Sequence, residues 1–350
     1  MHDAEDPALV ELGDHAGVPL EVARCVAEAD AVVVVTAANT VLHGGPATLL
    51  AACGADACRA ATSDSLLETH GSRGWELALA VERALQRRVP TIGVSLALSH
   101  PRLTGALLGY PYEPRAFERV ARSPFARMFR LLPAPLRMRT LRSFPSELGA
   151  IGVFAGTPSV AHSEALLRAI EPGSAALEQP LDAICIGVPR VTPFLPRERP
   201  NPLLASYLAL GYALRLWRDA FPVREGGTLV LAHNLRRRFA HPTQVPYRAF
   251  FRGAEETDVR ADARAVTQYR EGRTVHPLLP YADWDACAPA LGRLGTVLAA
   301  GCRDATAARR LGFVPVHGVP AALEMVREMT GGEGRLGFLL TPPYFPVRVG

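Results

Sequence analysis

The sequence predicts an α/β protein with two lobes, each with a mostly parallel sheet covered by helices. Short apolar runs rich in β-branched residues alternate along the chain with helical patterns. The runs are continuously apolar, which is typical of parallel strands buried on both faces of a sheet. The length of 350 residues corresponds to about two domains at roughly 150 residues each.

The apolar runs predict strands at residues 31–35, 91–95, 150–154, 182–186, 228–232, 295–299, 313–316 and 336–340. Helices are expected at residues 19–29, 47–53, 75–88, 159–170, 202–221, 304–311 and 319–329. The first of these helices places Val22, Cys25 and Val26 on one face, and Pro19 suits its first position, where a missing N–H has no partner to lose.

A domain boundary is expected near residues 156–158, which divides the chain into residues 1–157 and 158–350. A second irregular stretch covers residues 189–202 and contains five prolines. A loop of this length inside a compact domain is more often functional than not.

Composition excludes several classes of protein. The hydrophobic fraction of 49% and the charged fraction of 21% are ordinary for a globular protein, and a net charge of +4 is too small for a nucleic-acid binder. No apolar run approaches the about 18 residues of a membrane-spanning helix. The six cysteines form no CxxC pair, and the acidic N-terminus lacks the apolar core of a signal peptide. We therefore expect reduced thiols and a cytoplasmic location.

The chain contains no lysine, because all 38 of its Lys and Arg residues are arginine. A Schiff base, a lysine nucleophile and a P-loop lysine are thereby excluded. The absence is explained equally well by a GC-rich genome or by a functional reason.

The loop after the first predicted strand carries His43, Gly44 and Gly45. Glycines between a strand and a helix can hold the phosphate of a cofactor through backbone N–H groups, although a plain turn explains them too. His43 follows the carboxyl end of a parallel strand, where open α/β sheets bind ligands. It is the candidate acid/base group, and the alternative is a loop histidine in water.

An arginine-rich insert covers about residues 113–143. Between Arg115 and Arg142 it has eight arginines and one acid, Glu118, with apolar residues interleaved. Such a stretch suits contact with a membrane surface, an acidic partner or an anionic ligand. The alternative, which we favour, is a solvated helical cover on the sheet.

Two histidines, His233 and His241, flank the arginine triplet at residues 236–238. Their spacing, without a nearby carboxylate or cysteine, is a poor metal pattern. The triplet is a better anion site than the histidines are a metal site. A further loop begins at His276.

Several motifs follow one another along most of the chain in the order of a known family. Those of the first half are Glu11-Leu-Gly, Gly17-Val-Pro-Leu, Glu28-Ala-Asp-Ala-Val-Val, and Gly152-Val-Phe-Ala-Gly-Thr-Pro with His162. Those of the second half are Asp182-Ala-Ile-Cys-Ile-Gly-Val-Pro, Asn201-Pro-Leu, Gly211-Tyr, Arg224-Glu-Gly-Gly-Thr, His241-Pro-Thr-Gln-Val-Pro-Tyr, His276-Pro, Arg309-Arg-Leu-Gly-Phe and Pro342-Pro. Together they resemble the nickel-dependent lactate racemases, also described as nickel-pincer nucleotide enzymes.

The resemblance implies a racemase or epimerase that acts on a 2-hydroxy acid by hydride transfer. In that chemistry a histidine removes the hydroxyl proton and nickel in the pincer cofactor accepts the hydride. It also implies Arg190, His233 and His276 as substrate-binding residues, and Gly44 and Gly45 as cofactor-binding residues. Arg190 stands where the family has a lysine, keeps its charge and can hold a carboxylate through two hydrogen bonds.

Three departures from the family pattern bear on activity. Ala47 stands where the family's lysine anchors the cofactor, so no covalently attached pincer cofactor is expected. The family's nickel-binding histidine falls near Asp64, and His70 is the nearest candidate metal ligand. The family's "TRP" and "GTHRP" motifs, expected before Glu11, are absent from the sequence. Two interpretations remain: an isomerase with a noncovalently held cofactor, or a noncatalytic homologue that binds a small anion or serves as a scaffold. In both we expect a small anion, such as a hydroxy carboxylate, between Arg190 and His43.

Overall fold

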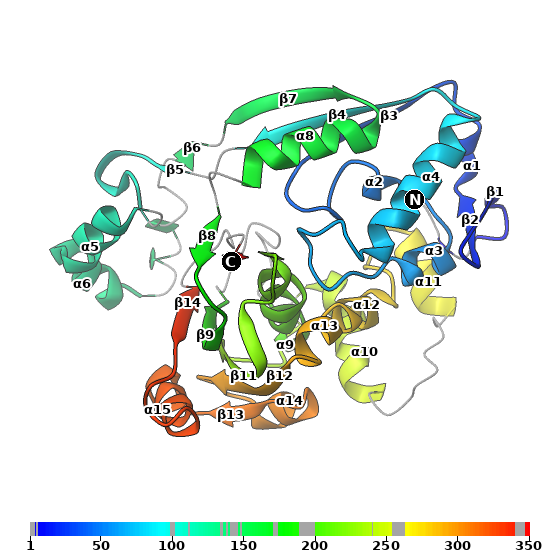
Figure 1. Cartoon of the computed structure of the whole chain (residues 1–350). Coiled ribbons are helices and arrows are strands. Elements are labelled where there is room, and N and C mark those ends of the chain that lie inside the picture. The colour runs from blue at the N-terminus through cyan, green and yellow to red at the C-terminus, as the bar shows by residue number, and fades with distance from the viewer. Residues whose placement is uncertain are drawn as a thin grey trace.

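The computed structural model describes residues 4, 6–98, 102–110, 113–133, 136–137, 139–140, 146–147, 149–170, 174–188, 200–239, 241–253, 263–339 and 347–350. Over these residues the protein is α/β, with mostly parallel sheets and many helices, as the alternating pattern predicts (Figure 1).

The larger sheet has five parallel strands. Their order is β13 (Val314–Val316), β12 (Leu294–Ala300), β11 (Val223–Ala232), β9 (Leu181–Gly187) and β14 (Leu336–Leu339). Successive residues of the central strands enter different hydrophobic clusters: Val230 packs in one and Leu229 and Leu231 in another. This sheet is therefore buried on both faces, which explains why its strands are continuously apolar.

Helices cover the five-stranded sheet. One face carries α15 (Val319–Met329), whose Val326 packs in the same cluster as Val230. The other elements of this half are α9 (Pro202–Ser206), η3 (Tyr207–Tyr212), η4 (Ala213–Arg215), η5 (Pro242–Gln244), α10 (Val245–Gly253), α11 (Ala263–Arg270), α12 (Leu279–Asp285), α13 (Ala288–Leu291) and α14 (Ala305–Arg310).

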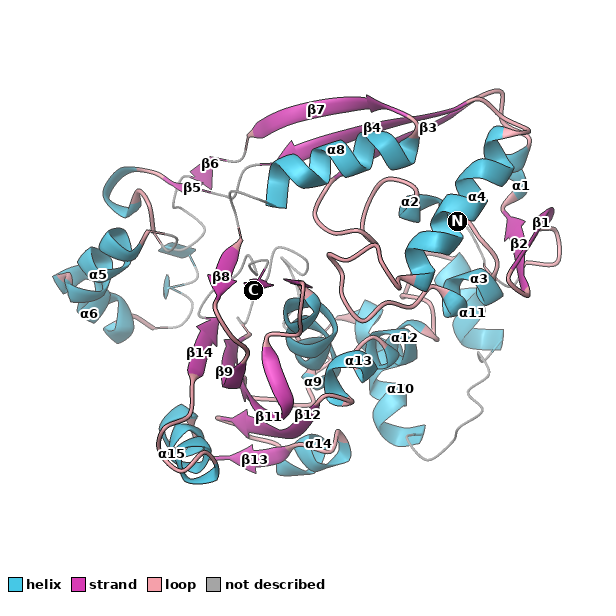
Figure 2. Ribbon diagram, viewed as in Figure 1, coloured by secondary structure: helices cyan, strands magenta, loops and turns pink. Residues whose placement is uncertain are grey.

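Among the residues that the structure describes, helices cover one face of the smaller sheet. It consists of β3 (Val32–Ala37) parallel to β4 (Thr91–Leu98), with β7 (Ala150–Gly156) antiparallel to β4. Helix α8 (Pro158–Ile170) packs along one face, as Figure 2 shows. On the other face Val33, Val35 and Val153 are 58%, 63% and 62% exposed. The prediction that helices cover both faces is wrong for this sheet.

The predicted helix at residues 19–29 is wrong over its first part, which forms a strand. A hairpin joins β1 (Val10–His15) to β2 (Val18–Val22) through Ala16 and Gly17, whose φ angles are both positive at 51° and 79°. Two such residues give the tight turn whose twist matches a hairpin. Only α1 (Arg24–Ala27) is helical here. Three further helices follow before β4: α2 (Ala47–Leu50), α3 (Ala55–Ala60) and α4 (Arg73–Gln86).

The predicted long helix at residues 202–221 is helical only as far as η4. It begins as α9, widens into the π-helical turn η3, tightens into η4 and then gives way to the strand β10 (Trp217–Arg218). Strand β10 pairs with β15 (Val347–Val349), which in turn pairs with β8 (Ala175–Leu177). The partner of β10 comes from the far end of the chain, so the local pattern does not reveal the change.

The arginine-rich insert forms α5 (Pro114–Arg122) and α6 (Pro124–Leu131), reached through β5 (Arg102–Leu103) and η1 (Gly105–Leu107) and left through β6 (Ser146–Glu147). The two helices pack on each other and stand apart from the larger sheets in Figure 1. The favoured interpretation as a cover on the sheet is therefore wrong. Leu131 is 85% exposed, and contact of this insert with a partner or surface stays a prediction.

The two halves of the chain share one hydrophobic cluster, in which Val41 and Leu66 pack with Leu203 and Leu210. The predicted boundary at residue 157 falls at the start of α8, and it stays a prediction. No helix in the described ranges combines the length and the apolar character that crossing a bilayer requires.

Candidate functional site

His43 lies in the loop after β3 and is held by the buried residue Thr40. The Thr40 hydroxyl oxygen accepts the backbone N–H of His43 at 3.0 Å and lies 2.7 Å from its Nδ1. The hydroxyl proton needs an acceptor, and Nδ1 is its hydrogen-bonding partner among the described residues. Nδ1 therefore accepts, and Nε2 carries the proton of the neutral ring. This network assigns the tautomer with Nε2–H directed away from Thr40.

The pKa of His43 is lowered to about 4, first because burial disfavours the imidazolium and second because of the positive charge of Arg215. The residue is nevertheless exposed to solvent. Both observations fit a side chain that is open to water on one side and faces protein on the others. At neutral pH the ring is therefore uncharged, a hydrogen-bond donor through Nε2 and a weak base.

A second histidine supports this loop from beneath. His162 is fully buried, and its Nε2 donates to the Thr40 carbonyl oxygen at 2.9 Å. Its Nδ1 has no hydrogen-bond partner among the described residues, and desolvation lowers its pKa, so the ring is neutral. Only its place in the family-like motif pointed to His162 in the sequence.

Gly44 and Gly45 let His162 approach the loop. A Cβ on Gly45 would lie 2.3 Å from the Cβ of His162, and one on Gly44 would lie 2.6 Å from its Cε1. Both glycines also have positive φ angles, 132° and 52°. The structure thus gives the pair a packing role. The helix that follows, α2, has a single turn of 4 residues, so the predicted contact of these glycines with a cofactor stays a prediction.

The start of α8 fixes where His162 lies. The backbone N–H and the hydroxyl of Ser159 donate to Glu82 Oε1 of α4 at 3.3 and 3.1 Å. This carboxylate satisfies an N–H of the first turn of α8, which has no partner within the helix. His162 follows on the same helix and points into the space beneath the loop.

Tyr212 faces His43 from the second half of the chain, with ring centroids 5.9 Å apart. It ends the π-helical turn η3, a kind of turn that is frequent at functional sites. Burial raises the pKa of Tyr212 to about 12, so its phenol stays protonated. We call His43, Thr40, His162 and Tyr212 the His43 junction. Sequence reasoning missed Tyr212 as a site residue.

Arg215 ties the two halves together next to this junction. Its guanidinium donates to the carbonyl oxygens of Ser63 and Asp64 in the first half, and of Gly211 and Ala286 in the second. The side chain is buried, and these carbonyls use its donors. Arg215 therefore positions the loops of the junction and is not available to hold a ligand.

The position that the resemblance gives to the nickel ligand does not suit a cation. Asp64 forms an ion pair with Arg293 at 3.4 Å and lies against Arg215. His70 is exposed in a turn beyond it. In the described part of the chain, no three His, Cys, Asp or Glu side chains gather in a way that suits a metal ion. His70 as a metal ligand stays a prediction.

The residues also do not fit a covalently attached cofactor. Ala47, which stands in place of the anchoring lysine, is 7% exposed and packs in a hydrophobic cluster with Leu20 and Leu49. A side chain at this position is packed in the core. No reaction step through a lysine-linked cofactor follows from this chain.

Of the three predicted substrate-binding residues, the structure describes two. Arg190 lies outside the described residues. His233 is buried, and its Nδ1 accepts the N–H of Leu235 at 3.2 Å. His276 accepts the N–H of Leu278 at 3.3 Å and packs its ring against Tyr269. Both histidines stabilise loops, and their contact with a substrate stays a prediction.

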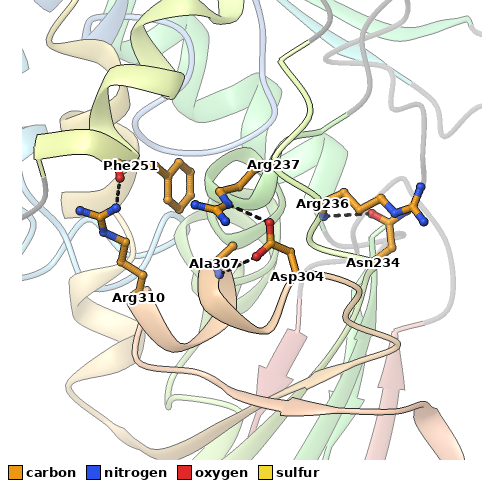
Figure 3. A network of polar contacts seen from close by, with 7 residues as sticks. All are labelled: Asn234, Arg236, Arg237, Phe251, Asp304, Ala307 and Arg310. Atoms are coloured by element: carbon orange, nitrogen blue, oxygen red, sulfur yellow. Dashed lines mark hydrogen bonds and ion pairs between the residues drawn. The ribbon is translucent and has the colours of Figure 1, made fainter.

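The arginine triplet follows β11, and its middle member, Arg237, donates to Asp304 Oδ2 at 2.8 Å (Figure 3). Asp304 follows β12, the neighbour of β11 in the sheet. The carboxyl ends of parallel strands meet at one edge, where ligands of open α/β sheets bind. The structure thus brings the triplet to such an edge.

Comparison with solved structures identifies the fold. The lactate racemase apoprotein from Thermoanaerobacterium thermosaccharolyticum matches with a TM-score of 0.54 and 12% identity, over 99% of this chain and 70% of the other. A protein from Thermotoga maritima matches with a TM-score of 0.48 and 11% identity, over 100% of this chain and 77% of the other. No family model and no curated protein sequence matches. The chain therefore has a lactate-racemase-like fold, strongly diverged in sequence.

Proposed function

We propose that the protein binds a small carboxylate at the His43 junction, and that the ligand is a 2-hydroxy acid. The observation that carries this proposal is the neutral His43 ring, fixed by Thr40 with its Nε2–H available and opposite Tyr212. The likeness to a lactate racemase suggests the ligand class, since lactate is a 2-hydroxy carboxylate.

In this proposal His43 binds an oxygen of the ligand and does not remove its hydroxyl proton. A base must accept a proton at its free nitrogen, whereas the Thr40 hydrogen bond leaves Nε2 protonated. A pKa of about 4 also makes the ring a weak base at neutral pH. An Nε2–H donor can bind either the carboxylate or the hydroxyl of such a ligand, and its bond to the carboxylate is the stronger of the two.

Racemisation or epimerisation by hydride transfer is the finer possibility that the fold suggests. It requires a hydride acceptor, and this chain has no lysine that could attach the pincer cofactor covalently. Binding without turnover is therefore the function that the described residues support best. An enzyme of this kind would interconvert D- and L-2-hydroxy acids and lose that activity in His43→Ala.

Calorimetric titration with D- and L-lactate tests the proposal. A hydrogen bond to a charged group contributes roughly 1.5–3 kcal/mol, so His43→Ala should weaken lactate binding about tenfold or more. Thr40→Val, which keeps the shape and removes the hydroxyl, should weaken binding by a smaller factor because the ring loses its orientation. His317→Ala is the matched control, an exposed histidine outside the junction, and should leave affinity unchanged. Equal affinity in wild type and His43→Ala would rule the proposal out.

A further inference from the structure

A separate cavity of about 520 Å³ lies beside the arginine triplet. Its lining residues are Arg237, Phe239, Arg248, Phe251 and Asp304, which we call the arginine pocket. The volume falls within the roughly 300–1,000 Å³ of small-molecule sites. One wall is α10, with Arg248 and Phe251, and the other is formed by the loops after β11 and β12.

An ion pair between Arg237 and Asp304 holds the wall formed by the loops after β11 and β12. Asp304 accepts from Arg237 through Oδ2 and caps α14 by accepting the Ala307 N–H through Oδ1 at 3.0 Å (Figure 3). Burial alone would raise the pKa of Asp304, but the hydrogen bonds from Arg237 and Ala307 outweigh burial and lower it. Asp304 is thus a carboxylate neutralised by Arg237, and neither charge is left for a ligand.

The opposite wall of the pocket is α10, which is held in place and carries an arginine without a described partner. Arg310 of α14 donates to the Phe251 carbonyl oxygen, which fastens the end of α10 against the pocket (Figure 3). Arg248, one turn earlier on α10, is exposed, and no described residue forms a hydrogen bond or an ion pair with its guanidinium. Among the described lining residues, Arg248 is therefore the arginine that has no acid paired with it.

Besides Arg248, aromatic residues also line the pocket. Phe251 is 4% exposed, and its ring centroid lies 6.1 Å from that of the half-buried Phe239. Phe239 is therefore the ring that offers apolar surface to the pocket, and the buried Phe251 packs behind it. Aromatic side chains of this kind bind flat apolar groups, while a guanidinium fixes a carboxylate through two parallel hydrogen bonds.

We propose that the arginine pocket binds a monocarboxylate with an aromatic or other flat apolar body. The guanidinium of Arg248 pairs with the carboxylate, and the body lies on Phe239, which Phe251 supports from the core. A second negative charge on the ligand would find no second arginine free of an acid among the described residues that line the pocket. The site is separate from the His43 junction, and nothing in its argument depends on the function proposed there.

Phenylacetate is the probe, titrated calorimetrically at neutral pH into the full chain. Acetate lacks the apolar body, phenylacetamide lacks the charge and phenyl phosphate carries a second charge. We expect phenylacetate to bind more tightly than all three. Arg248→Ala should weaken phenylacetate binding about ten- to a hundredfold, the usual range for losing a charge-assisted hydrogen bond. Phe239→Ala should weaken phenylacetate binding and leave acetate binding unchanged.

Two variants serve as controls. Arg238→Ala removes an exposed member of the same triplet that does not line the pocket, and it should leave phenylacetate binding unchanged. His43→Ala should also leave it unchanged, which separates this site from the proposed lactate site. Equal phenylacetate affinity in wild type and Arg248→Ala would overturn the proposal, and so would tighter binding of phenyl phosphate or equal binding of acetate.

Discussion

At the His43 junction the group offered to a ligand is a neutral imidazole, whereas at the arginine pocket it is a charged guanidinium. The direction of the His43 N–H depends on buried neighbours. Thr40 fixes the tautomer of His43, and His162 holds Thr40 in place. Arg248 needs no such support, because its charge does not depend on orientation and its side chain reaches the pocket from an exposed position. A neutral donor thus depends on the core beneath it for its orientation, whereas a charged donor depends on having no acid beside it.

Disturbing the packing beneath the His43 loop should have the largest effect on stability. Gly45→Ala places a Cβ 2.3 Å from the Cβ of His162 at a φ of 52°. Left-handed backbone costs a residue with a Cβ roughly 1–2 kcal/mol, and overpacking adds about 1–3 kcal/mol. We expect a total loss of about 3 kcal/mol in the free energy of unfolding, measured by urea denaturation. Lactate binding should weaken with it, and phenylacetate binding should not.

Gly272→Ala provides the matched control for this variant. Gly272 also has a positive φ, 71°, but a Cβ there meets nothing within 4 Å. Its substitution should therefore cost only the backbone strain of roughly 1–2 kcal/mol. Equal losses in the two variants would show that the contact of Gly45 with His162 does not support the loop.

A smaller effect, on ligand affinity alone, would show whether the His43 junction also uses a charged group. The sequence predicts that Arg190 holds the carboxylate opposite His43. If so, the His43 junction also uses a guanidinium, and Arg190→Ala should weaken lactate binding about ten- to a hundredfold. Calorimetry of this variant beside His43→Ala measures the two contributions separately. A thermal melt tells lost affinity from lost stability: an unchanged affinity with a lowered melting temperature would assign Arg190 to capping its loop.

The sequence predicted the strands of the larger sheet well because their burial on both faces leaves a continuous apolar run, as in β11 and β12. It failed for β10, because its partner β15 comes from the far end of the chain and leaves no mark in the local pattern. It also failed for β2, which pairs with its neighbour β1 through the two-residue turn at Ala16 and Gly17. There the apolar residues suited a helical face as well as a strand, and the helix was chosen.

The same limit applies to the two sites. His43 was recognisable from its place after a strand, but its tautomer depends on Thr40 and on His162, a residue 122 positions from Thr40. The triplet at residues 236–238 stood out by its charge alone, and its binding of an anion stays a prediction. Arg248 did not stand out, because the pairing of an arginine depends on which acids fold beside it.

The charge and tautomer of His43 decide the proposed function, and ¹⁵N NMR of its ring nitrogens from pH 3 to pH 8 measures both, with His43→Gln to assign the signals. Because desolvation and Arg215 lower the pKa to about 4, the ring should stay neutral from pH 8 to about 5 and gain its proton only around pH 4. Throughout the neutral range the proton should reside on Nε2, with Nδ1 showing the shift of an acceptor, and lactate should alter the Nε2 signal. Titration near the ordinary value of about 6.5, or a proton on Nδ1 at neutral pH, would contradict this account.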